Sequence, residues 1–85
     1  MVHKSQVEGY NGSMEALVEE IGNLKYNALA GFLDLLAAKI ERDGEKDKGR
    51  GRIKLAKQLE DCSGNLKNCK TSIEKAWVIC EPYTK

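Results

Sequence analysis

Apolar side chains recur along residues 55–80 at alternating steps of four and three. The positions are Leu55, Leu59, Cys62, Leu66, Cys69, Ile73, Ala76 and Cys80. This heptad repeat keeps one side of an α-helix against a partner helix. It predicts one long helix from about Arg50 to Cys80, which Pro82 then ends. Ser63, Gly64 and Asn65 fall at outward-facing positions of the heptad, so the seam continues through them. Two helices split at Gly64 are the alternative, because these three residues are poor helix formers.

A second apolar series, at helical spacing, precedes the first. Its members are Met14, Leu17, Val18, Ile21, Leu24, Ala28, Leu29, Phe32, Leu35, Leu36 and Ile40. Ser13 is a typical N-cap residue, and Glu15, Glu19 and Glu20 place negative charge near the positive end of the helix dipole. The pattern predicts a single helix from Ser13 to Arg42.

Between the two series, residues 43–51 contain only charged residues and glycine. Such a segment cannot pack into a core and is long enough to reverse the chain. The sequence therefore predicts an all-α protein built as a long antiparallel helical hairpin over residues 13–80, with a linker at 43–51. Residues 1–12 form an N-terminal tail or loosely docked arm, and residues 81–85 form a C-terminal tail.

The predicted hairpin has complementary charges and an excess of apolar surface. It brings Glu15, Glu19 and Glu20 beside the end of the second helix that carries Lys67, Lys70 and Lys75. The apolar arc of the first helix covers about 180°, more than one partner helix can bury. We therefore expect a homodimer in which two hairpins form a four-helix bundle. The expected dimer interface contains Leu29, Leu36, Ile40, Trp77 and Ile79.

Composition narrows the class of protein. The chain has 85 residues, 32% of them charged, and a formal net charge of +1. This balance gives no general attraction to nucleic acid or membranes. The longest apolar run, residues 28–38, is broken by Asp34 and is too short to cross a bilayer. We expect a soluble cytoplasmic protein without a membrane partner.

Three cysteines cannot form a complete set of disulfides within one chain. Cys62 and Cys69 lie on the heptad seam, so we expect them to be buried thiols, with Cys80 at least partly buried. No Cys-x-x-Cys motif and no cluster of cysteine with histidine occurs in the sequence, and we expect no metal site and no cofactor.

One basic stretch departs from the usual charge pattern of a helix start. It consists of Lys48, Arg50, Arg52, Lys54 and Lys57. Bases near a helix N-terminus are unfavourable, and such departures often occur at functional sites. We expect Gly49 and Gly51 to leave backbone N–H groups accessible, which would allow the stretch to bind anions or nucleic acid. The favoured interpretation is nevertheless a solvated charged loop.

No nucleophile, base or metal-ligand pattern stands out, and the Glu-x-x-His motif of di-iron bundles is absent. The sequence therefore favours a non-catalytic homodimeric module for protein interaction or regulation, with an unidentified protein partner. The alternative is a nucleic-acid or anion-binding accessory protein that uses the basic stretch Lys48–Lys57.

Overall fold

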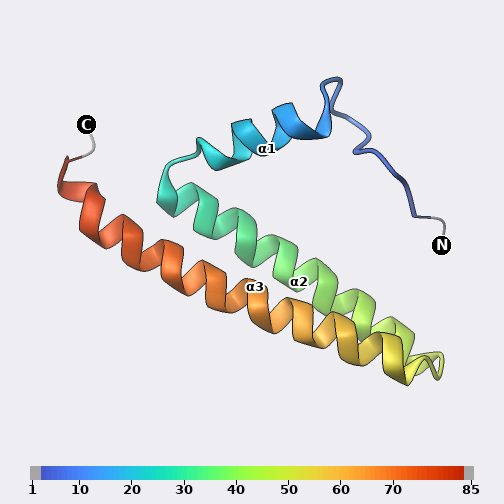
Figure 1. The fold of residues 1–85 in the computed structure, drawn as a ribbon. Coiled ribbons are helices and arrows are strands. Elements are labelled where there is room, and N and C mark those ends of the chain that lie inside the picture. Colours follow the sequence, from blue (N-terminus) through green and yellow to red (C-terminus); the bar gives the residue numbers. More distant parts are fainter. Residues whose placement is uncertain (1–2, 84–85) are drawn as a thin grey trace.

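Residues 3–83, the part of the chain that the computed structural model describes, contain three α-helices and one short 3₁₀ turn (Figure 1). The helices are α1 (Met14–Gly22), α2 (Tyr26–Gly49) and α3 (Ile53–Cys80), and η1 (Glu81–Tyr83) follows α3 directly. Residues 3–83 contain no strand, so the predicted all-α class is confirmed. The outermost residues of the two predicted tails, 1–2 and 84–85, lie outside the described residues.

The predicted first helix begins where expected but is broken in the middle. The Ser13 hydroxyl accepts a hydrogen bond from the backbone N–H of Ala16 at 3.1 Å, which caps α1. The helix ends at Gly22, and Lys25 adopts an extended conformation before α2 starts. The prediction of a single helix over residues 13–42 is therefore wrong. Gly22 and Asn23 are two weak helix formers in succession, and together they form a stop signal.

The predicted linker is mostly helical. α2 continues to Gly49, and only residues 50–52 reverse the chain. Asp43 forms an ion pair with Lys39, one turn earlier on the same helix, at 2.5 Å. Gly51 has a φ of +79°, a conformation that glycine adopts readily, and this permits the tight turn.

The second predicted helix is continuous. α3 passes through Gly64 without a break and ends at Cys80, before the short turn that contains Pro82. The alternative with two helices split at Gly64 is therefore wrong. An added Cβ on Gly64 would have no neighbour within 4 Å, so this glycine lies on an open side of α3.

Small residues form the contact between α2 and α3, which run antiparallel side by side (Figure 1). On α2 they recur every seven residues at Ala30, Ala37 and Gly44, and on α3 they include Ala56 and Ser63; all five are buried. The Ser63 hydroxyl donates a hydrogen bond to the Ala37 carbonyl at 3.1 Å. A Cβ on Gly44 would lie 3.3 Å from the Leu59 Cβ, so glycine permits the close approach of the two helices there.

This contact is displaced by one residue from the seam that the sequence suggested. Every second member of the predicted seam is replaced by the residue that follows it. The residues of α3 that face α2 are Ala56, Ser63, Lys70 and Trp77, in place of Leu55, Cys62, Cys69 and Ala76. The prediction that Cys62 and Cys69 are buried within the chain is wrong, because both are exposed. Cys80 is partly buried, as expected. Small side chains bring the helix backbones closer than leucine would allow, and close packing increases the dispersion attraction.

The ion pairs across this contact involve α2 and not α1. Lys67 lies 2.6 Å from Glu41, and Lys70 lies 3.6 Å from Asp34. The predicted pairing of these lysines with the glutamates of α1 is wrong, because α1 makes no extended contact with α2 or α3. Figure 1 shows α1 leaving the start of α2 and lying apart from the two long helices.

The molecule is only one helix layer thick. Its Cα positions extend over 49 × 30 × 14 Å, with a radius of gyration of 15.4 Å. A compact chain of this length would have a radius of gyration of about 12 Å. Ala30, Ala37 and Ala56 are the buried hydrophobic residues of the described chain, and no large side chain there is fully buried.

Candidate interaction surface

The α2–α3 pair has two unlike faces on either side of its contact line. The Ser63–Ala37 hydrogen bond marks the centre of that line. Each residue along an α-helix is rotated by about 100° about the helix axis. In an antiparallel pair, a rotation in the same sense from Ala37 on α2 and from Ser63 on α3 leads to the same side of the pair. We call these sides the polar face and the apolar face.

The polar face carries the ion pairs that join the middle of α2 to α3. Glu41, Glu45, Glu60 and Lys67 line one hollow on this side, and the Lys67–Glu41 and Lys70–Asp34 ion pairs cross it. The pKa of Glu41 is lowered, first by its hydrogen bond with Lys67 and then by the charge of that lysine. The pKa of Lys67 is raised for the same reason. The charges that cross the α2–α3 contact on this face are thus paired within the chain.

The apolar face has one strip of residues from each helix. The α2 strip consists of Leu29, Leu33, Leu36 and Ile40, and the α3 strip consists of Leu55, Leu59, Cys62, Leu66, Cys69, Ile73, Ala76 and Cys80. The α3 strip is the heptad series of residues 55–80. It extends over about 38 Å of helix and contains no charged residue. All of its members are exposed or only half-buried.

The exposed area is large for a chain of this size. The protein exposes 6802 Å², whereas a compact protein of 9.5 kDa would expose about 5,000 Å². The difference, roughly 1,800 Å², reflects the one-layer shape and is comparable with the area that each subunit buries in an obligate dimer. Large exposed apolar patches are unusual on monomers.

The predicted dimer-interface residues do not all lie together. Leu29, Leu36 and Ile40 lie on the apolar face, within the α2 strip. Trp77 is half-buried and lines hollows with Tyr26 on one side and Ala30 on the other, so it packs within the chain against the start of α2. Ile79 is 72% exposed and points away from α2, about 160° from the direction of Ser63.

The basic stretch surrounds the turn between α2 and α3. Arg52 forms an ion pair with Asp47 at 3.3 Å, and Lys57 forms one with Asp61 at 3.1 Å. Lys48, Arg50 and Lys54 have no ion-pair partner among residues 3–83. Since α2 extends to Gly49, Lys48 lies at a helix C-terminus, where the dipole favours positive charge.

The glycine N–H groups of this turn are already used. Gly51 donates its backbone N–H to the Lys48 carbonyl at 3.0 Å, and Gly49 belongs to α2. The expectation that both glycines offer accessible N–H groups to an anion is therefore wrong. The five bases are brought together by the turn, but the backbone does not form an anion-binding nest with them.

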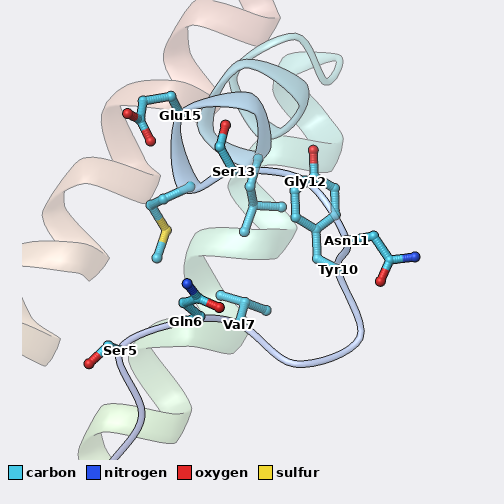
Figure 2. A pocket seen from close by; sticks show the side chains of 10 residues that line it. Ser5, Gln6, Val7, Tyr10, Asn11, Gly12, Ser13 and Glu15 are labelled. Atoms are coloured by element: carbon cyan, nitrogen blue, oxygen red, sulfur yellow. The ribbon is translucent and has the colours of Figure 1, made fainter.

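A separate hollow of about 690 Å³ lies between the N-terminal arm and the start of α1 (Figure 2). Figure 2 shows the arm curving past α1, with Gln6 and Val7 on one side and the Tyr10 ring beside Gly12. The pKa of Tyr10 is raised, first by partial burial and then by a hydrogen bond with Glu20. Glu15 is the one charged residue among those that line the hollow.

Residues 3–83 include no group of three or more histidine, cysteine, aspartate or glutamate residues placed to hold a metal ion. None of the helices formed by these residues is long and apolar enough to cross a membrane.

Sequence and structure comparisons were made with protein-family models, curated proteins and solved structures, and none of them matches this chain.

Proposed function

We propose that this protein is a non-catalytic, homodimeric module for protein interaction or regulation. Its α2–α3 pair acts as a helical hairpin, and two such hairpins pack through their apolar faces into a four-helix bundle. The observation that carries this proposal is the apolar face itself, which runs the length of a one-layer molecule without a charged residue on its α3 strip.

The size of the face supports a stable assembly and not a transient contact. Fully burying a leucine-sized side chain contributes about 1.5–3 kcal/mol, and each copy offers several that are now exposed or half-buried. A chain of this length has little stability of its own. Folding and dimerisation are therefore coupled, and the melting temperature rises with protein concentration.

Two adjacent leucines of α2 provide a matched test. Leu36 lies on the apolar face and is 37% exposed, whereas Leu35 points away from α3 and is 73% exposed. We expect Leu36→Glu to give unfolded chain, because it places a carboxylate in the dimer interface. Leu35→Glu should leave the dimer intact.

Sedimentation equilibrium and circular dichroism measure both outcomes. A wild-type protein that remains a folded monomer at all concentrations would contradict the proposal. An equal effect of Leu35→Glu and Leu36→Glu would also contradict it, because the apolar face would then have no special role.

The alternative is a nucleic-acid or anion-binding accessory protein. Lys48, Arg50 and Lys54 favour it, since the turn projects these three bases with no acid paired to them within residues 3–83. Binding of DNA or RNA through these bases would weaken steeply as salt increases. Fluorescence anisotropy with labelled oligonucleotides tests this, and a signal that Arg50→Glu does not change would exclude the turn as the site.

A further inference from the structure

The charges of this protein are separated between the two ends of the α2–α3 pair. At the turn end, residues 43–57, six bases and three acids leave a net charge of +3. Residues 74–83 at the open end, together with residues 13–25, which join α2 there, contain five acids and two bases and leave −3. Residues 26–42 and 58–73 between them are neutral overall, with four acids and four bases. The molecule is thus an electrical dipole along its long axis.

Both apolar strips have the same spacing when read in either direction. The α3 strip follows steps of four, three, four, three, four, three and four, and the α2 strip follows four, three and four. When a helix packs antiparallel on the same helix of a second copy, each apolar position of its strip therefore faces an apolar position of the copy. On α3 the match places Leu66 opposite Cys69 of the second copy, and on α2 it places Leu33 opposite Leu36.

The midpoints of the two strips lie level with each other. The midpoint on α2 falls between Leu33 and Leu36, beside Asp34, and that on α3 falls between Leu66 and Cys69. Lys70 pairs with Asp34 across the α2–α3 contact at 3.6 Å, so the two midpoints lie within about one helical turn of each other. A single two-fold axis perpendicular to the helices can therefore relate both strips to their copies.

We propose that the second copy docks on the apolar face with its long axis reversed, so that the turn end of each chain lies beside the open end of the other. This inference rests on the proposed homodimer and specifies its geometry. In this arrangement α2 packs on α2 of the second copy and α3 packs on α3, each antiparallel. The turn end with +3 faces the open end with −3, which is favourable electrostatic complementarity.

The opposite arrangement places both turns at the same end and is unfavourable in two respects. It brings two net charges of +3 together. It also packs the long α3 strip against α2 of the second copy, where Asp43 and Asp47 would lie against Leu55 and Leu59. Burying a carboxylate against apolar side chains is costly. The reversed arrangement instead brings Asp43 of one copy close to Lys25 of the other.

This geometry gives a role to the basic stretch and to α1. The bases of the turn need a negatively charged neighbour, and the glutamates of α1 lie at the open end without an ion pair within residues 3–83. In the reversed dimer the bases of one turn and the α1 glutamates of the other copy lie in the same half of the assembly. A second copy of this chain then supplies the negative charge that Lys48, Arg50 and Lys54 lack.

Charge reversal distinguishes the two arrangements by the sign of its effect. Arg50→Glu with Lys54→Glu should raise the dimer dissociation constant by about tenfold, because it removes solvent-screened charge complementarity at both ends of the dimer. Adding Glu15→Lys and Glu19→Lys to the same chain should restore most of the affinity. In the arrangement with both turns together, the first pair of changes would tighten the dimer. Arg42→Glu, in the neutral middle, is the control and should have little effect.

A distance measurement gives an independent test. Because the native cysteines lie on the α3 strip, the chain in which alanine replaces them is first shown by sedimentation to dimerise. A spin label on Lys48→Cys in that chain should lie about 40 Å from its copy, close to the length of α3. Both turns at one end would bring these labels within about 25 Å, roughly two helix diameters. A label on Asn65→Cys, near the proposed axis, should lie close to its copy in either arrangement and serves as the control.

The outcomes separate this inference from the proposed function. A monomer in sedimentation, with no dipolar coupling at either labelled site, would overturn the homodimer itself. A dimer whose labels on residue 48 lie close together, or which is tightened by Arg50→Glu with Lys54→Glu, would overturn only the reversed arrangement. A distance near 40 Å together with rescue by the α1 changes would support it.

Discussion

The polar and apolar faces of the α2–α3 pair use the same two helices in different ways. The polar face is completed within the chain, by Glu41 with Lys67 and Asp34 with Lys70. On the apolar face, the α3 strip carries only leucine, isoleucine, alanine and cysteine, and His3 of the N-terminal arm lines a hollow with Ile40, Leu55 and Leu59 at the turn end. The comparison shows that the helices carry two overlapping heptad patterns. The pattern of small residues closes the pair, and the pattern of large residues remains available for a second molecule.

The largest effect is expected from enlarging a small residue at the contact between α2 and α3. Ala37 is 0% exposed, and its carbonyl accepts the Ser63 hydrogen bond. Ala37→Leu would force the helices apart and cost about 3 kcal/mol or more, at the upper end of overpacking effects. Ala28→Leu, on the exposed side of α2, is the matched control and should change stability little. Urea unfolding followed by circular dichroism measures both; equal losses would show that the contact is not tightly packed.

The sequence indicated the apolar positions correctly but not their role. The heptad series from Leu55 to Cys80 stood out because its side chains are large, and it was assigned to the contact within the chain. The actual contact uses Ala30, Ala37 and Ala56, which carry a weak hydropathy signal but allow the backbones to approach closely. Small residues at a seven-residue spacing are the signal that would have identified it.

The helix boundaries show a similar limit. Gly22 and Gly44 are the same residue type, yet one ends α1 and the other lies buried inside α2. Local propensity disfavours glycine in both helices, and only the neighbouring helix α3, with Leu59 3.3 Å from an added Cβ, makes Gly44 favourable. A contact between residues distant in the sequence cannot be read from local composition. The start of α1 at Ser13 was predicted correctly, because a cap depends on neighbouring residues alone.

The thiols of the apolar face report whether it is covered. Cys62 and Cys69 are exposed in the single chain and lie on the α3 strip. If dimerisation covers this strip, labelling by a maleimide should slow about tenfold when the protein concentration rises well above the dissociation constant, because only the open fraction reacts. Mass spectrometry of the labelled peptides measures each site. Labelling in denaturant is the control and should not depend on concentration. Equally fast labelling at all concentrations would show that the face stays open.

Replacing each of two glycines by alanine should change the stability of the protein by at most about 1 kcal/mol. Gly64 lies on an open side of α3, so Gly64→Ala should stabilise the protein by about the difference in helix propensity, close to 1 kcal/mol. Gly44→Ala should gain less or lose stability, because its Cβ meets Leu59 at 3.3 Å. Thermal melts at a fixed protein concentration compare the two variants. A larger gain for Gly44→Ala would contradict the close approach of α2 to α3.

The smallest effect is expected on the polar face, from the Glu41–Lys67 ion pair. Both side chains are about half exposed, at 45% and 53%, so solvent screens the pair and its contribution is small. The hydrogen bond with Lys67 lowers the pKa of Glu41 below its ordinary value of 4.5 in the folded protein. The contribution is therefore present above pH 4.5 and is lost as the pH falls through the lowered pKa.

Melting temperatures measured as a function of pH test this contribution. The difference in melting temperature between wild type and Glu41→Gln should be small near neutral pH and should vanish in acid. Glu45→Gln, on the same face but without an ion pair within residues 3–83, is the control variant. A polar face that contributed as much as the apolar face would instead make Glu41→Gln as damaging as Leu36→Glu, and the two faces would no longer differ in kind.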